Sequence, residues 1–282
     1  GDQILTSRSV WRTDVLPQQI EKAWNDPETL YSVLIMAIRD NFFEDVIVAA
    51  EHLMDIDPVK HRCYNLLGIV YLKTNNLAKA EQTLEKGIGI SDYKAALTTN
   101  LAKVYAAQGQ EQKAINTLWQ ALQLDPNQDN ALDWFASIEL EKDPEFGHMT
   151  AYGKVAQIPG SWRAQIFIAR FYLESKEFNT AKNLYEDVLK NVGDEPEALM
   201  SISGDLAKNK RFEDIFYLIF PIFNIDKHGP YTAMNLINVC IEIRNKDEGV
   251  RIAKDLRNYI HTFNRADLLN TLNILEKKLE EL

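Results

Sequence analysis

The chain has 282 residues, with 41 acidic and 31 basic side chains and a formal net charge of −10. It contains only 12 glycines and 9 prolines, too few turn residues for a sandwich or barrel built from many short strands. Hydrophobic residues make up 46% and charged residues 26%, so the composition is that of a folded protein. The acidic balance argues against binding of duplex nucleic acid, because that role normally needs a basic face.

The N-terminal segment is predicted to form an extension, residues 1–26. Residues 1 to about 13 are expected to be loosely ordered. A short leading helix is predicted over Leu16–Trp24, with Pro17 in its first turn, where a missing N–H costs nothing. No signal-peptide pattern opens the chain, which favours a cytoplasmic location, although a sequence that begins at Gly1 leaves open the loss of a targeting segment.

From residue 27 onward the sequence repeats with a period of 34 residues. The clearest unit runs from Asn100 to Ala114, NLAKVYAAQGQEQKA, and the same spacing returns 34 residues upstream and again downstream. Repeats begin near Pro27, His61, Ala95, Asp129, Trp162, Pro196 and Pro230. Such regular self-similarity indicates stacked supersecondary units in one array, residues 27–263.

Within a repeat, the apolar pattern predicts two amphipathic helices, because apolar residues recur at spacings of three and four. In the second repeat they are Tyr64, Leu67, Tyr71, Leu77, Ala80 and Leu84. Small residues such as Gly68 and Ala102 fall where neighbouring helices come closest. Aspartate–proline pairs at 26–27, 57–58, 125–126 and 143–144 mark helix starts or turns.

This pattern resembles the tetratricopeptide repeat, whose unit pairs two antiparallel helices. The resemblance implies an all-α fold, a right-handed α-solenoid of about seven stacked helix pairs. The fourth repeat departs from the family pattern, since Glu139 stands where an aromatic residue belongs. In the sixth, Ile215 and Ile222 replace small residues.

The C-terminal tail, residues 264–282, carries a stripe of leucines on an otherwise polar helix. The stripe consists of Leu268, Leu272, Leu275, Leu279 and Leu282. We predict a capping helix for the last repeat. A coiled-coil dimer seam is the alternative, although two heptads are few for one.

No catalytic or metal-binding pattern occurs in the sequence. The five histidines are scattered over different repeats, and there is no phosphate-binding glycine loop and no nucleophile elbow. The two cysteines, Cys63 and Cys240, are far apart and are predicted to be buried hydrophobes, with a single bridge as the alternative. We therefore expect no enzyme, no metal and no cofactor. No apolar run is long enough to cross a bilayer.

The resemblance implies that the first helix of each repeat lines a concave binding surface. At those positions the first three repeats carry four basic side chains and one acid, Glu28. The predicted groove residues are Arg39, Arg62, Asn65, Lys73, Asn100, Lys103, Trp134, Arg163 and Arg170. The basic residues would attract an acidic partner segment, and the asparagines would bind its backbone. The alternatives are ordinary solvated charges and, for Trp134, a side chain that only fills space.

A second candidate surface lies in the apolar stretch from Phe212 to Phe223. The second helix of a repeat should have a polar outer face, but Tyr217, Phe220 and Phe223 make this face almost entirely apolar. Pro221 should end or kink the helix. A large apolar surface needs a cover. An intramolecular cover is favoured, and the alternatives are another protein or a homodimer through this C-terminal third.

Together these features predict a non-catalytic scaffold or adaptor that binds a peptide or protein segment in its groove. The alternatives are a peptide-responsive regulator and an accessory module of a larger enzyme or envelope-assembly protein.

Overall fold

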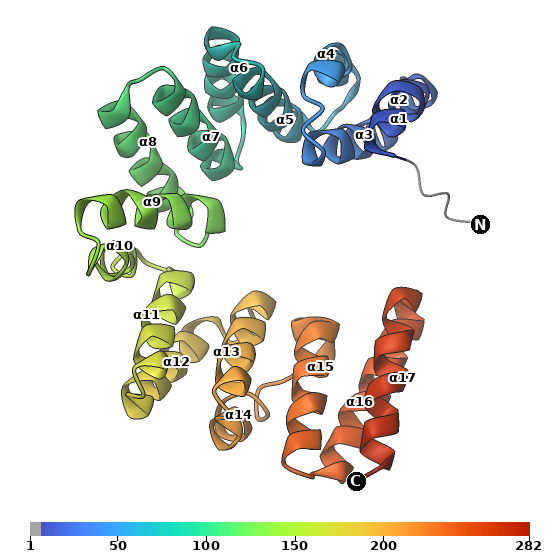
Figure 1. The fold of residues 1–282 in the computed structure, drawn as a ribbon, viewed down its shortest axis with the longest axis vertical. Coiled ribbons are helices and arrows are strands. Elements are labelled where there is room, and N and C mark those ends of the chain that lie inside the picture. The colour runs from blue at the N-terminus through green and yellow to red at the C-terminus, as the bar shows by residue number, and fades with distance from the viewer. Residues whose placement is uncertain (1–6) are drawn as a thin grey trace. The chain divides into compact units, whose positions relative to one another are not determined.

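The computed structural model describes residues 7–282, and every regular element in that range is a helix (Figure 1). Residues 1–6, part of the segment expected to be loosely ordered, lie outside the described residues. The chain forms two compact units, one reaching to Phe135 and the other starting at Ala136.

The first unit opens with a continuous helical segment, which helix pairs follow. α1 (Arg8–Val10), a π-helical turn (Trp11–Val15) and α2 (Leu16–Ala23) succeed one another without a break. The pairs are α3 (Pro27–Arg39) with α4 (Ile47–Ile56), α5 (Lys60–Lys73) with α6 (Leu77–Ile90), and α7 (Lys94–Ala107) with α8 (Glu111–Leu124). A short 3-10 turn (Glu44–Val46) leads into α4. The next helix, α9 (Asp129–Lys142), has residues in both units.

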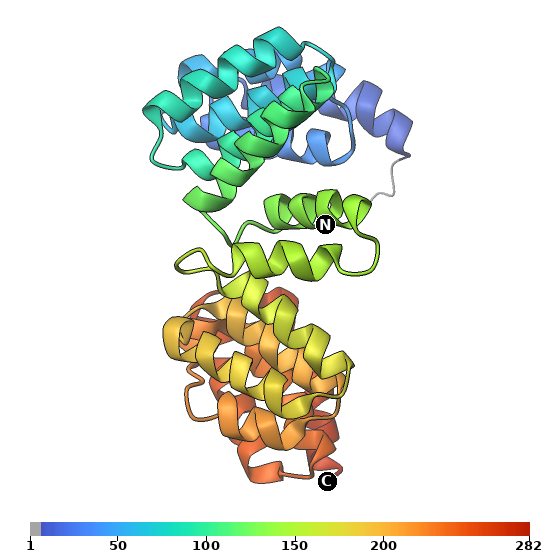
Figure 2. The ribbon, with the colours of Figure 1, turned by 90° about the vertical axis from the view of Figure 1, so that its left-hand side faces the viewer.

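The second unit continues the same alternation of helices (Figure 2). It contains α10 (Gly147–Val155), α11 (Trp162–Glu174) with α12 (Phe178–Val192), α13 (Pro196–Lys208) with α14 (Phe212–Leu218), and α15 (Ile225–Glu242) with α16 (Lys246–Thr262). A 3-10 turn (Ala266–Leu268) and α17 (Leu269–Glu280) complete it.

The helix starts follow the predicted repeat. Six helices begin at the predicted residue or one residue before it: α3, α5, α7, α9, α11 and α13. In α15, Gly229 has a φ of 72° and breaks the helix, which resumes at Pro230, the seventh predicted start. The all-α fold of stacked helix pairs is thereby confirmed.

The aspartates of the four Asp–Pro pairs accept backbone hydrogen bonds, as their positions predict. Asp26 accepts from the N–H groups of Glu28 and Thr29 at 3.2 and 3.3 Å and so caps α3. The other three make the same kind of bond to the residue two positions on: Asp57 to Val59, Asp125 to Asn127, and Asp143 to Glu145. Local sequence therefore sets these helix starts and turns.

The prediction that the chain is loosely ordered up to about residue 13 is wrong for residues 8–13, which are helical. Trp11 stacks on Phe42 with ring centroids 5.7 Å apart, and Arg12 Nε donates to Asp45 Oδ2 at 2.8 Å. Both partners lie more than thirty residues away in sequence. Tertiary contacts, not local pattern, order this segment.

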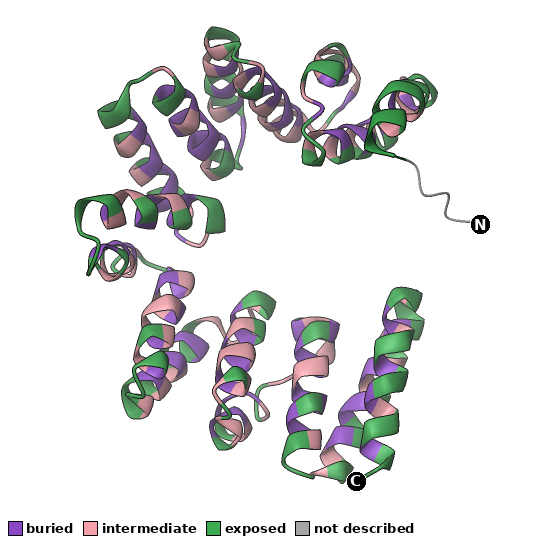
Figure 3. Cartoon of the chain, in the orientation of Figure 1, coloured by how far each residue is buried: buried purple, intermediate pink, exposed green. Residues whose placement is uncertain are grey.

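Buried residues line the helix faces that meet a neighbouring helix (Figure 3). In the first unit, a Cβ on Gly68 would lie 2.5 Å from Leu84 Cδ2, and one on Gly87 would lie 2.7 Å from Tyr64 Cβ. Small residues thus stand where helices approach most closely, as predicted. Within residues 7–282, no helix combines the length and apolarity needed to cross a membrane.

In the second unit, the leucine stripe of the tail faces inward. Leu268, Leu272, Leu275 and Leu279 are buried in the core shared with α15 and α16, whereas Leu282 is 43% exposed. A Cβ on Gly249 would lie 2.5 Å from Leu279 Cδ2, so α16 and α17 approach closely. The leucine stripe therefore packs against helices of its own unit.

Candidate protein-interaction surface

The first helices of the pairs provide the predicted surface. Within the first unit, α3, α5 and α7 lie in one layer, and α4, α6 and α8 lie in the other (Figure 1). We call the surface of α3, α5 and α7 that faces away from α4, α6 and α8 the inner face. Its polar residues at the predicted positions are Glu28, Arg39, Arg62, Asn65, Lys73, Asn100 and Lys103.

Arg62 joins two repeats within the inner face. Its Nε donates to Asp57 Oδ2 at 2.6 Å, and its other two nitrogens donate to the Glu28 carboxylate at 2.9 and 2.6 Å. The guanidinium lies over the ring of Tyr31, 4.6 Å from its centroid. Hydrogen bonds to Glu28 and Asp57 raise the pKa of Arg62 above its ordinary value. All of its nitrogens are thus bound inside the chain, and Arg62 is not a free charge of the predicted groove.

The two predicted asparagines bind each other. Asn100 Nδ2 donates to Asn65 Oδ1 at 2.8 Å, which links α7 to α5. Asn100 is 9% exposed, and Asn65 is half-buried. This bond uses one donor and one acceptor, and each side-chain amide keeps further capacity.

The remaining basic residues of the inner face lack carboxylate partners. Arg39 and Lys73 are exposed at the C-terminal ends of α3 and α5, and Lys103 is half-buried on α7. Burial lowers the pKa of Lys103 below its ordinary value, and the nearby charge of Lys73 lowers it further. Among the described residues, none of these three cations forms an ion pair. We call them the basic patch.

The predicted arginines of the second unit are paired like Arg62. Arg163 binds Glu197 and lies over the ring of Trp162 at 4.5 Å. Arg170 Nε donates to Asp205 Oδ1 at 2.8 Å. Burial raises the pKa of Asp205 above its ordinary value. Both pairs join α11 to α13.

Two of these ion pairs could have been predicted from the sequence, because their partners are separated by one repeat length. Arg62 and Glu28 are 34 residues apart, as are Arg163 and Glu197, so each pair occupies equivalent positions of adjacent repeats. Adjacent repeats place such positions side by side. An arginine with an acid one period away is therefore expected to pair with it.

The remaining predicted residues are Trp134 and those of the apolar surface near Pro221. Trp134 is half-buried and packs against the core of the first unit. α14 ends at Leu218, before Pro221, as predicted. Phe220 stacks on Phe216 with centroids 4.0 Å apart, and Phe223 lies 6.0 Å from the His228 ring. Tyr217 stays 63% exposed, with the Lys182 ammonium 4.0 Å from its ring centroid.

Neither cysteine is exposed on a candidate interaction surface. Cys63 and Cys240 are free and buried, and burial raises the pKa of each thiol to about 12. In the part of the chain that the structure describes, no group of three or more His, Cys, Asp or Glu side chains could hold a metal ion.

The succession of similar helix pairs defines a helical-repeat protein. The tetratricopeptide repeat family model matches residues 61–93 and 95–128, the second and third predicted repeats. Residues 61–128 of the chain therefore contain two tetratricopeptide repeats. Such repeats are in general non-catalytic interaction modules, and the chain is accordingly a protein-interaction scaffold.

Several solved structures are similar to the chain at low identity, and no curated protein matches it in sequence. MamA from Desulfovibrio magneticus RS-1 is 21% identical with a TM-score of 0.41, over 54% of this chain and 87% of MamA. Pseudomonas aeruginosa PilF is 18% identical with a TM-score of 0.37, over 71% of this chain and 91% of PilF. Yeast Tom70 is 12% identical with a TM-score of 0.49, over 95% of this chain and 58% of Tom70. Similarity at this level carries no information about partners.

Proposed function

We propose that the inner face of the first unit binds a partner segment that carries carboxylates. The observation that supports this is the basic patch: Lys73 and Lys103 are close enough to repel, and neither has a carboxylate partner within the described residues. A half-buried ammonium without a counterion is unfavourable. A carboxylate of a partner would supply the missing charge.

The neighbouring groups fit such a segment. The Asn65–Asn100 pair, on the same two helices as the lysines, retains amide donors and acceptors for a peptide backbone. Arg62 is bound to both Glu28 and Asp57, so the positive charge comes from Arg39, Lys73 and Lys103. On a chain with a net charge of −10, this patch would orient an acidic segment and accelerate its association.

Reversing the two lysine charges tests the proposal. A labelled decapeptide of alternating glutamate and serine serves as the probe, and fluorescence anisotropy measures its Kd at low and high salt. We expect the Lys73→Glu/Lys103→Glu variant to bind about tenfold more weakly at low salt and to lose most of the salt dependence.

The matched control is Lys22→Glu/Lys86→Glu, which changes the net charge equally. Both of these lysines are exposed and lie on α2 and α6, outside the inner face. The control should bind the probe nearly as well as the wild type. Equal weakening by both double variants would contradict a local site and would indicate only a general effect of net charge.

Tyr217, Phe220 and Phe223 form the second proposed contact surface. Contacts with Phe216 and His228 partly cover the two phenylalanines, which supports the intramolecular cover over a homodimer. Light scattering is therefore expected to give the mass of one chain at all concentrations. A mass that doubles as concentration rises, and returns to that of one chain in Tyr217→Asp, would instead support the dimer.

A further inference from the structure

His228 differs from the other histidines of the chain in its burial. It is only 3% exposed, whereas the other four are half-buried or exposed. It lies in the first turn of α15, directly before Gly229, and a non-helical stretch, residues 219–224, joins that turn to α14. We call residues 219–229 the linker.

Both imidazole nitrogens of His228 have backbone partners. The Asn224 N–H donates to Nδ1 at 2.9 Å, and Nε2 lies 2.8 Å from the Gly193 carbonyl oxygen. A carbonyl oxygen can only accept, so Nε2 carries the proton and Nδ1 is the acceptor. The arrangement requires a neutral ring, because both nitrogens of a protonated imidazole are donors. The bond to Gly193 ties the linker to the turn after α12, 35 residues away.

Protonation of His228 would break this arrangement. A proton on Nδ1 would face the Asn224 N–H, so that two donors would stand 2.9 Å apart. The ring would also carry a charge while it is buried, which is unfavourable when the new N–H has no acceptor. If the linker opens, both nitrogens can donate to water. Opening therefore favours the uptake of a proton.

The charged side chains beside His228 compensate each other. The Lys227 ammonium binds both carboxylate oxygens of Asp194, at 2.8 and 2.9 Å. This bond lowers the pKa of Asp194 below its ordinary value, so the carboxylate stays ionised and paired where histidine titrates. In the described structure, the other acids of these two turns, Glu195 and Asp226, are not hydrogen-bonded to the ring.

The residues on either side of His228 define what its release would change. Gly229 has a φ of 72° and a ψ of 178°, a region that only glycine adopts readily, and the helix resumes at Pro230. On the other side, the Phe223 ring lies 6.0 Å from the imidazole, centroid to centroid. Release of His228 would free the residues before Gly229 and uncover Phe223, while the helix beyond Pro230 could stay in place.

We infer that His228 is a proton-sensitive latch, which holds the linker closed near neutral pH and releases it in mild acid. Histidine in an unfolded chain protonates near about pH 6.5. The stabilisation from the neutral ring is fully present above that pH and is lost progressively below it. If the second contact surface exists as proposed above, the latch would also regulate it, because opening uncovers Phe223.

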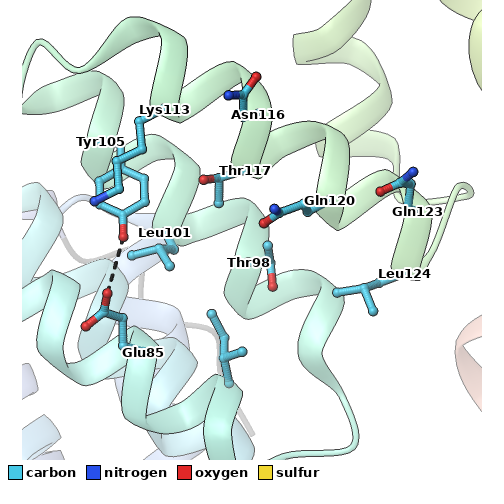
Figure 4. A pocket seen from close by; sticks show the side chains of 11 residues that line it. Glu85, Thr98, Leu101, Tyr105, Lys113, Asn116, Thr117, Gln120, Gln123 and Leu124 are labelled. Atoms are coloured by element: carbon cyan, nitrogen blue, oxygen red, sulfur yellow. Dashed lines mark hydrogen bonds between the residues drawn. The ribbon is translucent and has the colours of Figure 1, made fainter.

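A polar cluster of the first unit supplies an internal reference. It lines a cavity of about 680 Å³ between α6 and α8 (Figure 4). There Tyr105 donates its hydroxyl proton to Glu85 Oε1 at 3.3 Å, and the Lys113 ammonium lies 3.6 Å from the Tyr105 ring centroid. Burial raises the pKa of Tyr105, and the interaction with Tyr105 raises the pKa of Lys113. Neither group changes its charge in mild acid, so α6, α7 and α8 should respond little.

Hydrogen exchange with mass spectrometry tests the latch at about pH 7.5 and 5.5, on either side of the range in which histidine titrates. Exchange times are adjusted for the intrinsic effect of pH on exchange. Uptake of one proton on opening makes opening about tenfold more favourable over this interval. We expect the linker amides of the wild type to lose about tenfold in protection, and those of α6, α7 and α8 to keep theirs. In His228→Gln, which can donate to a carbonyl but does not titrate, linker protection should not depend on pH.

Two further measurements separate the latch from other effects of acid. His261→Gln makes the same change at an exposed position of α16, in the same unit, and should keep the wild-type response. Nitrogen-15 NMR of the wild-type imidazole needs no substitution and should show Nε2 protonated and Nδ1 bare near neutral pH. The inference is overturned if wild-type linker protection is equal at both pH values, if His228→Gln keeps the wild-type response, or if Nδ1 carries the proton.

Discussion

Replacing Arg62 with leucine is expected to destabilise the first unit by about 3 kcal/mol, the range found when one partner of a buried ion pair is removed. Asp57 is fully buried, and Arg62 supplies the charge that compensates it. Leucine keeps apolar contact with Tyr31 but leaves the carboxylate without a cation, with the Val59 N–H at 2.7 Å and the Cys63 thiol as its remaining partners. Native-state hydrogen exchange of the α3 and α5 amides measures the loss within this unit.

A second variant identifies the cause. In Asp57→Asn/Arg62→Leu, the asparagine oxygen can still accept from Val59, and no unpaired charge remains. This double variant should be more stable than Arg62→Leu alone, which is the sign of a direct coupling. If the two variants lose equal stability, the uncompensated Asp57 charge is not the reason.

The effect should also depend on pH. Burial alone raises the pKa of Asp57, but the hydrogen bonds from Arg62 and Val59 outweigh it, so the pKa lies below its ordinary value. A lowered folded-state pKa contributes stability that is fully present above the unfolded value of about 3.9. That contribution disappears as the pH falls through the folded-state pKa. The stability difference between wild type and Arg62→Leu should therefore be largest near neutral pH and shrink in acid.

Gly147→Ala is expected to destabilise the packing of α9 against α10 by about 2–3 kcal/mol, at the upper end for overpacking. A Cβ at this position would lie 2.4 Å from the Glu139 carbonyl oxygen and 2.5 Å from Leu140 Cα. These are backbone atoms, so α9 and α10 would have to separate. The 2.7 Å ion pair between Lys154 and Glu139 would then be strained as well.

Gly153→Ala is the matched control in the same helix. A Cβ there has no atom within 4 Å, so alanine should stabilise α10 by up to about 1 kcal/mol through its higher helix propensity. Urea unfolding and protease resistance of both variants measure the difference. Opposite shifts are expected, and equal destabilisation would show that the close approach to Glu139 is not responsible.

Much of the fold could be predicted from local sequence. The starts of α3, α9, α11 and α13 coincide with the predicted repeat starts, because helical periodicity and Asp–Pro capping act within one or two turns. Gly68 could likewise be assigned to a close approach, since only a residue without a side chain permits that distance from Leu84.

The chemistry of the inner face could be predicted only in part. Whether an arginine is free depends on what stands beside it in space, and Arg62 and Glu28 meet across 34 residues. Arg170 differs again, because its partner Asp205 is 35 residues away and not one period. Lys73 and Lys103 remain unpaired for the same reason, since no carboxylate of the described chain reaches them.

The sequence by itself determined the repeat, its period and the helix pairs, because these depend on contacts between residues close together in the chain. Only the tertiary structure decided which charges neutralise one another, how Trp11 orders the start of the first unit, and where a cavity opens between α6 and α8. Each of those depends on side chains that neighbouring helices bring together, and their distances are not encoded in any local pattern.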